Sequence, residues 1–276
     1  MTARLLACLS VSILAFGGAA SARDSAFETS FDSMHLKGWS IGHYNFSSPK
    51  FATDWRSWQT QIGDGLMLSL DPHPRCPNAY AGASIRRSEP TGFGRYSATL
   101  KAASGAGVIT GFFTYTGAYY GTPHDEIDIE ILGKDTTKIN IAWFADGKRS
   151  DRIIDLGFDA AEGMHDYAFE WREDRIDWYV DGRLIFTATA EDGPLPRSPG
   201  MLFANVWAAD ASIASWSGKI GPDVRTRAQI ARLGFVPFGE HDRGRRVRSV
   251  AIDEPLMSRP GRGRQSTPTP AHRRGR

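Results

Sequence analysis

Three acidic residues alternate with isoleucines in the middle of the chain, where the sequence 124–133 reads HDEIDIEILG. A period of two is typical of a strand with one buried and one exposed face. The isoleucines are therefore predicted to point into a core, and Glu126, Asp128 and Glu130 to project in a row from the other face. A solvated acidic face is the alternative, but no lysine or arginine is interleaved to relieve the repulsion. We therefore interpret the row as a site that does chemistry.

Carboxylates in such a row are suited to the hydrolysis of glycosidic bonds, which needs one ionised nucleophile and one protonated general acid. A retaining enzyme places the two carboxyl groups about 5–5.5 Å apart. The Cα atoms of Glu126 and Glu130 would lie about 13 Å apart on a strand that rises ~3.3 Å per residue, so their side chains must lean together. Asp128 would hydrogen-bond to one of them, and neighbouring charges would raise the pKa of the least solvated carboxyl. The spacing alone leaves the individual roles open.

The acidic row and its flanks resemble glycoside hydrolase family 16, and within it the bacterial licheninases (endo-β-1,3-1,4-glucanases) and the neighbouring exopolysaccharide depolymerases. The resemblance covers about residues 80–216 and is carried by GFFTYTGAYYGTPHDEIDIEILG (111–133), IIDLGFDAAEGMHDYAFEW (153–171) and WYVDGRLIFTAT (178–189). It implies that Glu126 is the nucleophile, that Glu130 is the acid/base and that Asp128 assists. It also implies a retaining endo-β-glucanase that cleaves internal bonds of a β-1,3-1,4-glucan or a related bacterial exopolysaccharide.

Arg86, Asn205, Trp207 and Trp216 match cleft positions of that family, and Phe113 and Tyr115 lie on the strand before the acidic row. Packing within the fold is the alternative for each candidate that follows. The candidates are aromatic or hydrogen-bonding side chains that we expect to line the cleft: Arg86, Phe113, Tyr115, His124, Trp143, Asn205, Trp207 and Trp216. Three positions depart from the licheninase pattern, since His124 replaces a tryptophan, Ser84 a glutamate and Ala142 an asparagine. These departures alter the sugar subsites and weaken the expectation that β-1,3-1,4-glucan is the substrate. A purely structural role is the alternative for His124.

Many short strands with turn signals, and almost no helical periodicity, predict an all-β protein built as an antiparallel β-sandwich. The resemblance implies a jelly roll of the concanavalin A type, with an open concave cleft. Strands are predicted at 66–70, 82–87, 94–103, 107–116, 137–145, 165–171, 175–180, 183–189, 201–207 and 227–237. The Asp181-Gly182 pair is a strong signal for a two-residue hairpin between two of these strands.

Composition divides the chain into three parts. Residues 1–22 resemble a secretory signal peptide, with Arg4, a short apolar run at 5–15 and an Ala20-Ser21-Ala22 cleavage site. The apolar run is short for a membrane span, so we expect export to the periplasm or the medium. Residues 23–238 form the predicted catalytic domain, and the arginine-rich segment 239–276 is predicted to be disordered.

The remaining expectations concern partners and cofactors. The basic tail is predicted to bind an acidic polysaccharide or the cell envelope, or to be an inert solvated segment, and no nucleic acid partner is expected. We expect a monomer with no required cofactor. The resemblance suggests a structural calcium ion, but only Gly65 matches a ligand position, and Ala231 stands where the family has an aspartate. The same scaffold could also serve a transglycosylase or a non-catalytic lectin.

Overall fold

The structure is a computed structural model that describes residues 25–32 and 36–239. The predicted signal peptide 1–22 lies outside the described residues, as does the basic tail apart from Gly239. Within the described ranges, no helix is both long and apolar enough to cross a bilayer.

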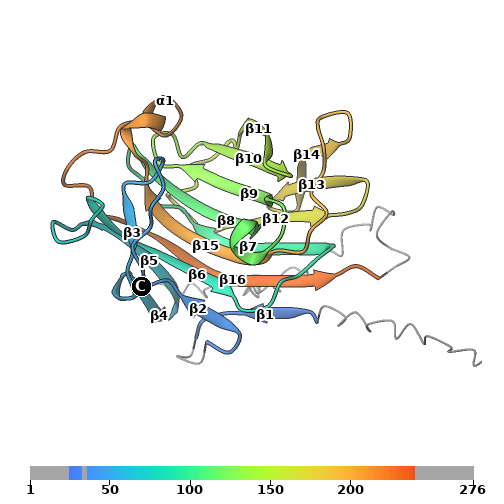
Figure 1. Cartoon of the computed structure of the whole chain (residues 1–276), viewed down its shortest axis with the longest axis horizontal. Helices are drawn as coiled ribbons and strands as arrows, with labels where there is room; N and C mark the ends of the chain where they lie inside the picture. Colours follow the sequence, from blue (N-terminus) through green and yellow to red (C-terminus); the bar gives the residue numbers. More distant parts are fainter. Residues whose placement is uncertain (1–24, 33–35, 240–276) are drawn as a thin grey trace, which may run out of the picture. The chain divides into compact units, whose positions relative to one another are not determined.

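Two antiparallel sheets make up the fold, and they are joined where β6 pairs with β5 (Figure 1). The first, here called the front sheet, contains in spatial order β11 (Lys148–Asp155), β10 (Lys138–Ala145), β9 (Asp125–Leu132), β8 (Val108–Thr116), β15 (Met201–Ala208) and β6 (Tyr80–Arg87), with β2 (Trp39–Ile41) also paired to β6. The second, the back sheet, contains β5 (Gly65–Pro72), β16 (Thr226–Pro237), β7 (Gly94–Lys101), β12 (His165–Trp171), β13 (Arg175–Val180) and β14 (Arg183–Thr189).

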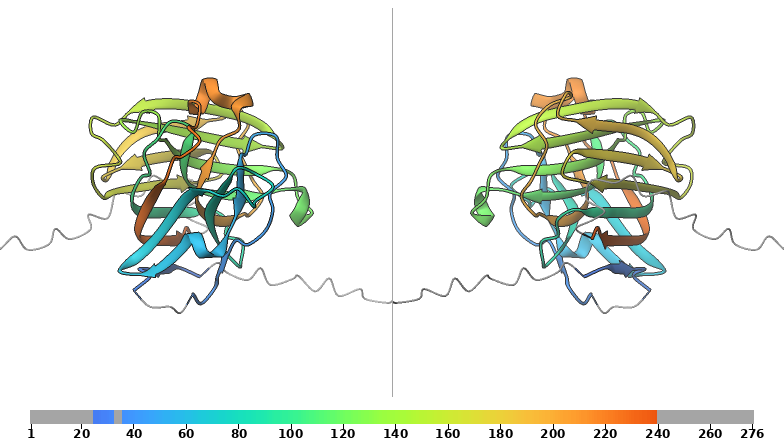
Figure 2. Two further views of the ribbon diagram at one scale, coloured as in Figure 1. Left: turned by 90° about the vertical axis from the view of Figure 1, so that its left-hand side faces the viewer. Right: turned by 90° about the vertical axis from the view of Figure 1, so that its right-hand side faces the viewer.

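Short elements complete the two sheets. Two strands extend the back sheet, β1 (Phe27–Thr29) on β16 and β4 (Thr60–Gly63) on β5, while β3 (Thr53–Trp55) pairs in parallel with β6. Single helical turns occur only in connections: η1 (Ser57–Gln59), η2 (Ala118–Tyr120), η3 (Ala211–Ile213) and α1 (Ala214–Ser217). Figure 2 shows η2 as a short green coil that projects from the edge of the ribbon just before β9. The predicted antiparallel sandwich is confirmed.

The core lies between the two sheets. The isoleucines of β9 point into it, and Ile127, Ile129 and Ile131 are all at most 1% exposed. Aromatic rings of the back sheet meet them from the other side, and Phe112 of β8 packs against Phe169 of β12 with ring centroids 5.7 Å apart. Because one face of β9 is fixed in this core, the acidic residues between the isoleucines must face outward.

Most predicted strands are confirmed to within two residues at each end. The hairpin at Asp181-Gly182 joins β13 to β14, and both turn residues have positive φ values, 48° and 74°, as a type I′ turn requires. Strand β11 was not predicted. Its sequence KRSDRIID is mostly charged because it is the edge of the front sheet and buries little of either face.

Candidate active site

The acidic row lies at the middle of the front sheet, on the face opposite the core. Register places Tyr115, Phe113 and Gly111 of β8 directly beside Glu126, Asp128 and Glu130. On the other side, β10 places Phe144, Ala142 and Asn140 beside the same three acids. Glu126 is therefore flanked by two aromatic residues, Tyr115 and Phe144, whereas Glu130 is flanked by the small Gly111 and the polar Asn140.

Asp128 is the most enclosed member of the row, with 5% of its surface exposed. Burial raises its pKa well above the ordinary value, and the charges of Glu126 and Glu130 and a hydrogen bond to Glu126 raise it further. Its surroundings therefore favour the neutral, protonated form of Asp128. A protonated carboxyl can donate, so Asp128 donates its proton to the Glu126 carboxylate and holds it in place.

Glu130 has the environment of a general acid. Burial and the charge of Glu126 raise its pKa to about 7, while Arg149 on β11 and a hydrogen bond from Asn140 oppose the rise. The Asn140 Nδ2 atom donates to Oε2 of Glu130 across 3.0 Å. At neutral pH a large fraction of Glu130 therefore carries a proton that it can give to a leaving group.

Asn140 was missed by sequence reasoning, which looked for an amide at position 142 and found alanine. The signal was present, since Asn140 is the one polar residue inside the apolar stretch INIAWF. It is 1% exposed and pairs directly with Glu130 in the sheet register.

Trp143, which we predicted to contact sugar, does not reach the acidic face. Side chains alternate along β10, so Trp143 points into the core while its neighbour Ala142 faces Asp128. Its ring is 0% exposed, and its Nε1 atom donates to the carbonyl of Pro194 across 3.1 Å. The prediction for Trp143 is wrong because it ignored this alternation.

Gly111 leaves open space next to Glu130. It is paired with Glu130 on one side and with Asn205 on the other. A Cβ atom at this position would lie 2.6 Å from Oδ1 of Asn205, closer than atoms can approach. Asn205 is 5% exposed, and its Oδ1 finds no hydrogen-bond partner within the described residues. The glycine thus leaves room for the Asn205 amide on one side and has Glu130 as its neighbour on the other.

Arg86, Phe113 and Tyr115 lie on the same face as the acids. Arg86 is paired with Phe203 of β15 and donates to the sulfur of Met201 across 3.3 Å. Phe113 stacks on Phe203 with centroids 5.1 Å apart. Together these side chains extend the site from the acidic row toward β6.

Trp207 and Trp216 are more enclosed than a sugar platform would be. Trp207 faces the same side as Asn205 but is only 6% exposed, because Phe51 stacks on it at 4.0 Å. Trp216 stacks on Trp207 at 6.2 Å. Both rings belong to a small apolar cluster built around Trp55 at one end of the front sheet.

His124 lies beside the first acid of the row. Its Nε2 atom is 2.6 Å from Oε2 of Glu126. The ring stacks on Phe144 with centroids 4.6 Å apart and meets the edge of Tyr115 at 5.3 Å.

Asp125 fixes the start of β9. Its carboxylate accepts backbone N–H groups from Asp146, Arg197 and Ser198 at 2.8–2.9 Å. Burial works to raise its pKa, but these hydrogen bonds outweigh burial and hold the pKa below the ordinary value. The carboxylate thereby connects two loops to the first residue of β9.

The expected calcium position fits a cation poorly. A Cβ at Gly65 would lie 2.9 Å from the carbonyl oxygen of Ile230, so Gly65 is adjacent to the bulge of β16 at Ala231. Ala231 offers no carboxylate there, and calcium favours several oxygen ligands including acidic ones.

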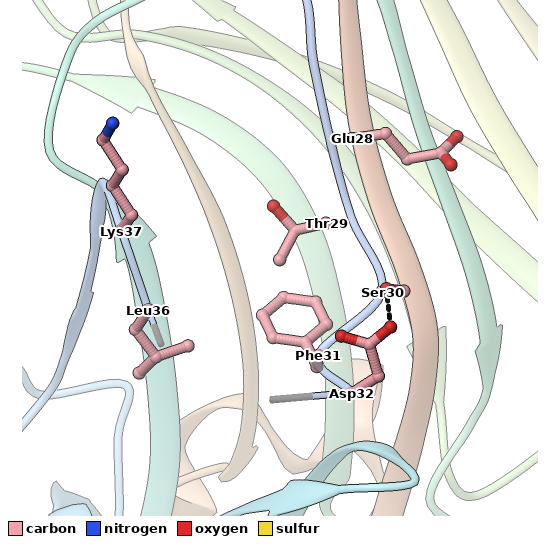
Figure 3. A pocket seen from close by; sticks show the side chains of 7 residues that line it. All are labelled: Glu28, Thr29, Ser30, Phe31, Asp32, Leu36 and Lys37. Carbon is pink, nitrogen blue, oxygen red and sulfur yellow. Dashed lines mark hydrogen bonds between the residues drawn. The ribbon is translucent and has the colours of Figure 1, made fainter. Parts of the chain in front are cut away.

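Among the hollows of the described residues, two are informative. One, of about 430 Å³, adjoins Asn140 and is lined by Lys134, Asp135 and Lys138 together with apolar residues of β9 to β11. The other, shown in Figure 3, lies beside β1 around Phe31, with Ser30 donating to Asp32 across 3.0 Å. The acids of β9 do not line this second hollow, so it is separate from the site described above.

Comparison with known proteins agrees with this geometry. The model of the glycosyl hydrolases family 16 matches residues 47–228. The chain belongs to glycoside hydrolase family 16.

Family 16 relatives resemble the chain over most of its length. A beta-glucanase of Bacillus licheniformis is 36% identical over 219 residues, which are 78% of this chain and 87% of that protein. A beta-glucanase of Acetivibrio thermocellus is 33% identical over 87% of this chain and 71% of its own length. A solved prokaryotic β-1,3-1,4-glucanase (lichenase) from a mouse hindgut metagenome is 33% identical with a TM-score of 0.74, covering 78% of this chain and all of that one. The chain is therefore a glycoside hydrolase.

Proposed function

We propose that the protein is a secreted retaining endo-β-glucanase that hydrolyses internal bonds of a β-glucan or of a related bacterial exopolysaccharide. The single observation that carries the proposal is the contrast between the two glutamates of β9. Burial and the charge of Glu126 raise the pKa of Glu130 to about 7, whereas Glu126 is hydrogen-bonded to His124 and to Asp128. The beta-glucanase relatives support the choice of polymer.

The reaction then proceeds in two steps. Glu126 attacks the anomeric carbon, the glycosidic bond breaks, and Glu130 gives its proton to the departing oxygen. Once Glu126 is esterified, its charge is gone, and the pKa of Glu130 falls because the charge of Glu126 was one cause of its rise. Glu130 can then take a proton from water, which attacks the same carbon and releases Glu126.

Substrate contacts are assigned to the residues that share the outward face. Arg86, Phe113, Tyr115 and Asn205 are proposed to bind sugar, with Trp207 and Trp216 shaping the end of the site. A lectin on the same scaffold would have no use for a glutamate whose pKa is raised to about 7 beside a second glutamate. A transglycosylase shares the first step, and the two outcomes differ only in the acceptor.

A product profile tests the proposed activity. The protein without residues 1–22 is incubated with lichenan, laminarin, xyloglucan and succinoglycan, and reducing ends and chain lengths are measured. Early products of intermediate length from lichenan or succinoglycan are expected, because an endo enzyme cuts within chains. Products longer than the starting oligosaccharides would show transglycosylation, and no new reducing ends on any polymer would contradict the proposal.

A second experiment tests the retaining mechanism and the role of Glu126. Glu126→Ala should lose about 10⁴-fold or more of its activity, as expected for removal of a nucleophile that acts as part of a unit. Added azide fits the space and should attack an activated aryl glycoside to give an α-glycosyl azide, measured by ¹H NMR. A β-configured azide, or no rescue in a folded variant, would contradict the assignment.

A further inference from the structure

The ring of His124 contacts Glu126 directly and is held in one orientation. Its Nε2 atom lies 2.6 Å from Oε2 of Glu126. One ring face stacks on Phe144 with an interplanar angle of 20°, and Tyr115 packs edge-on against it. The backbone is fixed as well, since the carbonyl of His124 accepts the N–H of Gly147 across 2.9 Å.

The direction of this hydrogen bond follows from chemistry. An ionised carboxylate can only accept, so Nε2 of His124 must carry the proton. Burial and two neighbouring charges raise the pKa of Asp128, which favours its protonated form as a second donor to the same carboxylate. Because His124 contacts Oε2, we assign the attack on a sugar to Oε1 of Glu126.

We propose that His124 is a positioning residue that stabilises the charge on Glu126 when that carboxylate leaves the sugar. The inference rests on the proposed role of Glu126 as nucleophile. In the second step, water attacks the anomeric carbon, one water proton passes to Glu130, and the bond from carbon to Oε1 breaks with its electrons returning to Glu126. The negative charge is then shared with Oε2, which accepts a hydrogen bond from the Nε2–H of His124.

The hydrogen bond from His124 should accelerate the second step, in which Glu126 leaves the sugar, more than the first. A hydrogen bond to a carboxylate is stronger than one to an ester carbonyl, because the acceptor is charged. Removing the donor therefore destabilises the free carboxylate relative to the glycosyl-enzyme. Loss of the donor should let the intermediate accumulate, which neither a sugar contact nor simple packing predicts.

Two matched substitutions separate these roles. His124→Phe keeps a ring that can stack on Phe144 but has no donor, whereas His124→Gln keeps an N–H donor and loses the ring. Each is assayed with a dinitrophenyl β-glycoside of a lichenan-derived oligosaccharide, whose leaving group needs no protonation. Aglycone release is followed by stopped flow and in steady state.

For His124→Phe we expect a burst of aglycone, with kcat and KM both lowered about tenfold or more, the size expected for a lost charge-assisted hydrogen bond. His124→Gln should show a smaller burst and recover most of kcat. Raised KM without a burst in both variants would indicate a sugar contact instead. Wild-type behaviour of the phenylalanine variant, or failure of glutamine to restore kcat, would also overturn the proposal.

A spectroscopic measurement keeps the proposal testable if a variant fails to fold. In ¹⁵N-labelled wild-type protein, the imidazole of His124 should be protonated at Nε2, and its proton resonance should lie far downfield. Glu126→Gln should move that resonance upfield, because the acceptor becomes neutral. An unprotonated Nε2 in the wild type would overturn the proposal, and so would a proton resonance that has the same chemical shift in Glu126→Gln. Failure of azide rescue in Glu126→Ala would instead overturn the nucleophile assignment, so the two results can be told apart.

Discussion

The two glutamates of β9 are four residues apart, yet their surroundings differ. Glu126 is hydrogen-bonded to His124 and to Asp128. Glu130 receives a hydrogen bond from Asn140, which is too little to offset burial and the charge of Glu126. Neighbouring side chains, rather than the acids themselves, therefore decide which carboxyl can act as the acid.

Asn140→Ala tests this balance through the pH profile. The amide of Asn140 stabilises charged Glu130, so its removal should raise the Glu130 pKa above about 7. The alkaline limb of kcat/KM should move to higher pH by up to about one unit, and the acid limb should stay. The measurement is initial rate on lichenan between pH 4 and 10.

Glu130→Ala serves as the control for that limb. It should abolish the alkaline limb and spare activated aryl glycosides far more than polysaccharide, because these need no proton. An alkaline limb that moves to lower pH in Asn140→Ala, or that survives in Glu130→Ala, would contradict the assignment of Glu130.

At the scale of elements, β9 can hold its three acids in place only because its first residue and its register with the neighbouring strands are fixed. The carboxylate of Asp125 joins it to the turn after β10 and to the loop before β15 through three backbone hydrogen bonds. On the core side, Trp178 of β13 donates to the carbonyl of Asp128 across 3.1 Å. The catalytic strand is thereby connected to elements of both sheets.

Asp125→Asn should destabilise the fold by about 2–3 kcal/mol at pH 7, because hydrogen bonds to a charged acceptor are lost. The pKa of Asp125 is lowered in the folded protein. Its contribution is therefore present above the unfolded pKa of about 3.9 and is lost as pH falls through the folded value. The free energy of unfolding of the wild type and of Asp125→Asn is measured with urea at pH 7 and at pH 3. The difference between the two proteins should be smaller at pH 3. Asp64→Asn, at an exposed position, is the control and should change the free energy of unfolding little. A difference between wild type and Asp125→Asn that is equal at both pH values would contradict this account.

How far the sequence predicts this arrangement depends on how each strand is buried. Strands that bury one face, such as β7 with Tyr96, Ala98 and Leu100 inward, were predicted because burial leaves an alternating pattern. Strand β11 buries little and leaves no such pattern. The errors on Trp143 and Asn140 have one cause. Only the pairing of β10 with β9 shows that the even-numbered residues of β10, and not the odd-numbered ones, lie on the face of the acids.

At the scale of the whole molecule, the basic segment after the catalytic domain is the part most distinct in composition. It contains ten arginines between Arg243 and Arg276. The last described residues end close to the back sheet, where Arg172 lies over the ring of Phe238 at 4.0 Å. We propose that the segment beyond Gly239 binds anionic polysaccharide and takes no part in the chemistry.

A protein that ends at Gly239 should keep its kcat on lichenan within about twofold, because the acidic row and its partners all precede that point. It should lose retention on an anionic polysaccharide gel, and retention of the full-length chain should fall as salt screens the charges. A matched full-length variant with the ten arginines replaced by glutamine distinguishes the effect of the positive charge on retention from the effect of the length of the segment. Equal retention of the full-length and shortened proteins would contradict a docking role.

The burial of the acidic row also sets how many protons the fold carries. At pH 6 most of Glu130 is protonated in the folded protein, because its pKa is raised to about 7, whereas free carboxyls titrate near 4. Unfolding at pH 6 should therefore release about one proton from Glu130, with a further contribution from Asp128, whose pKa is also raised, and stability should decline as pH rises toward 7. Scanning calorimetry would register this release directly: the apparent enthalpy of unfolding should change with the ionisation heat of the buffer, with a slope equal to the protons released. The acids that prepare the protein for catalysis thus make its folding a proton-uptake reaction.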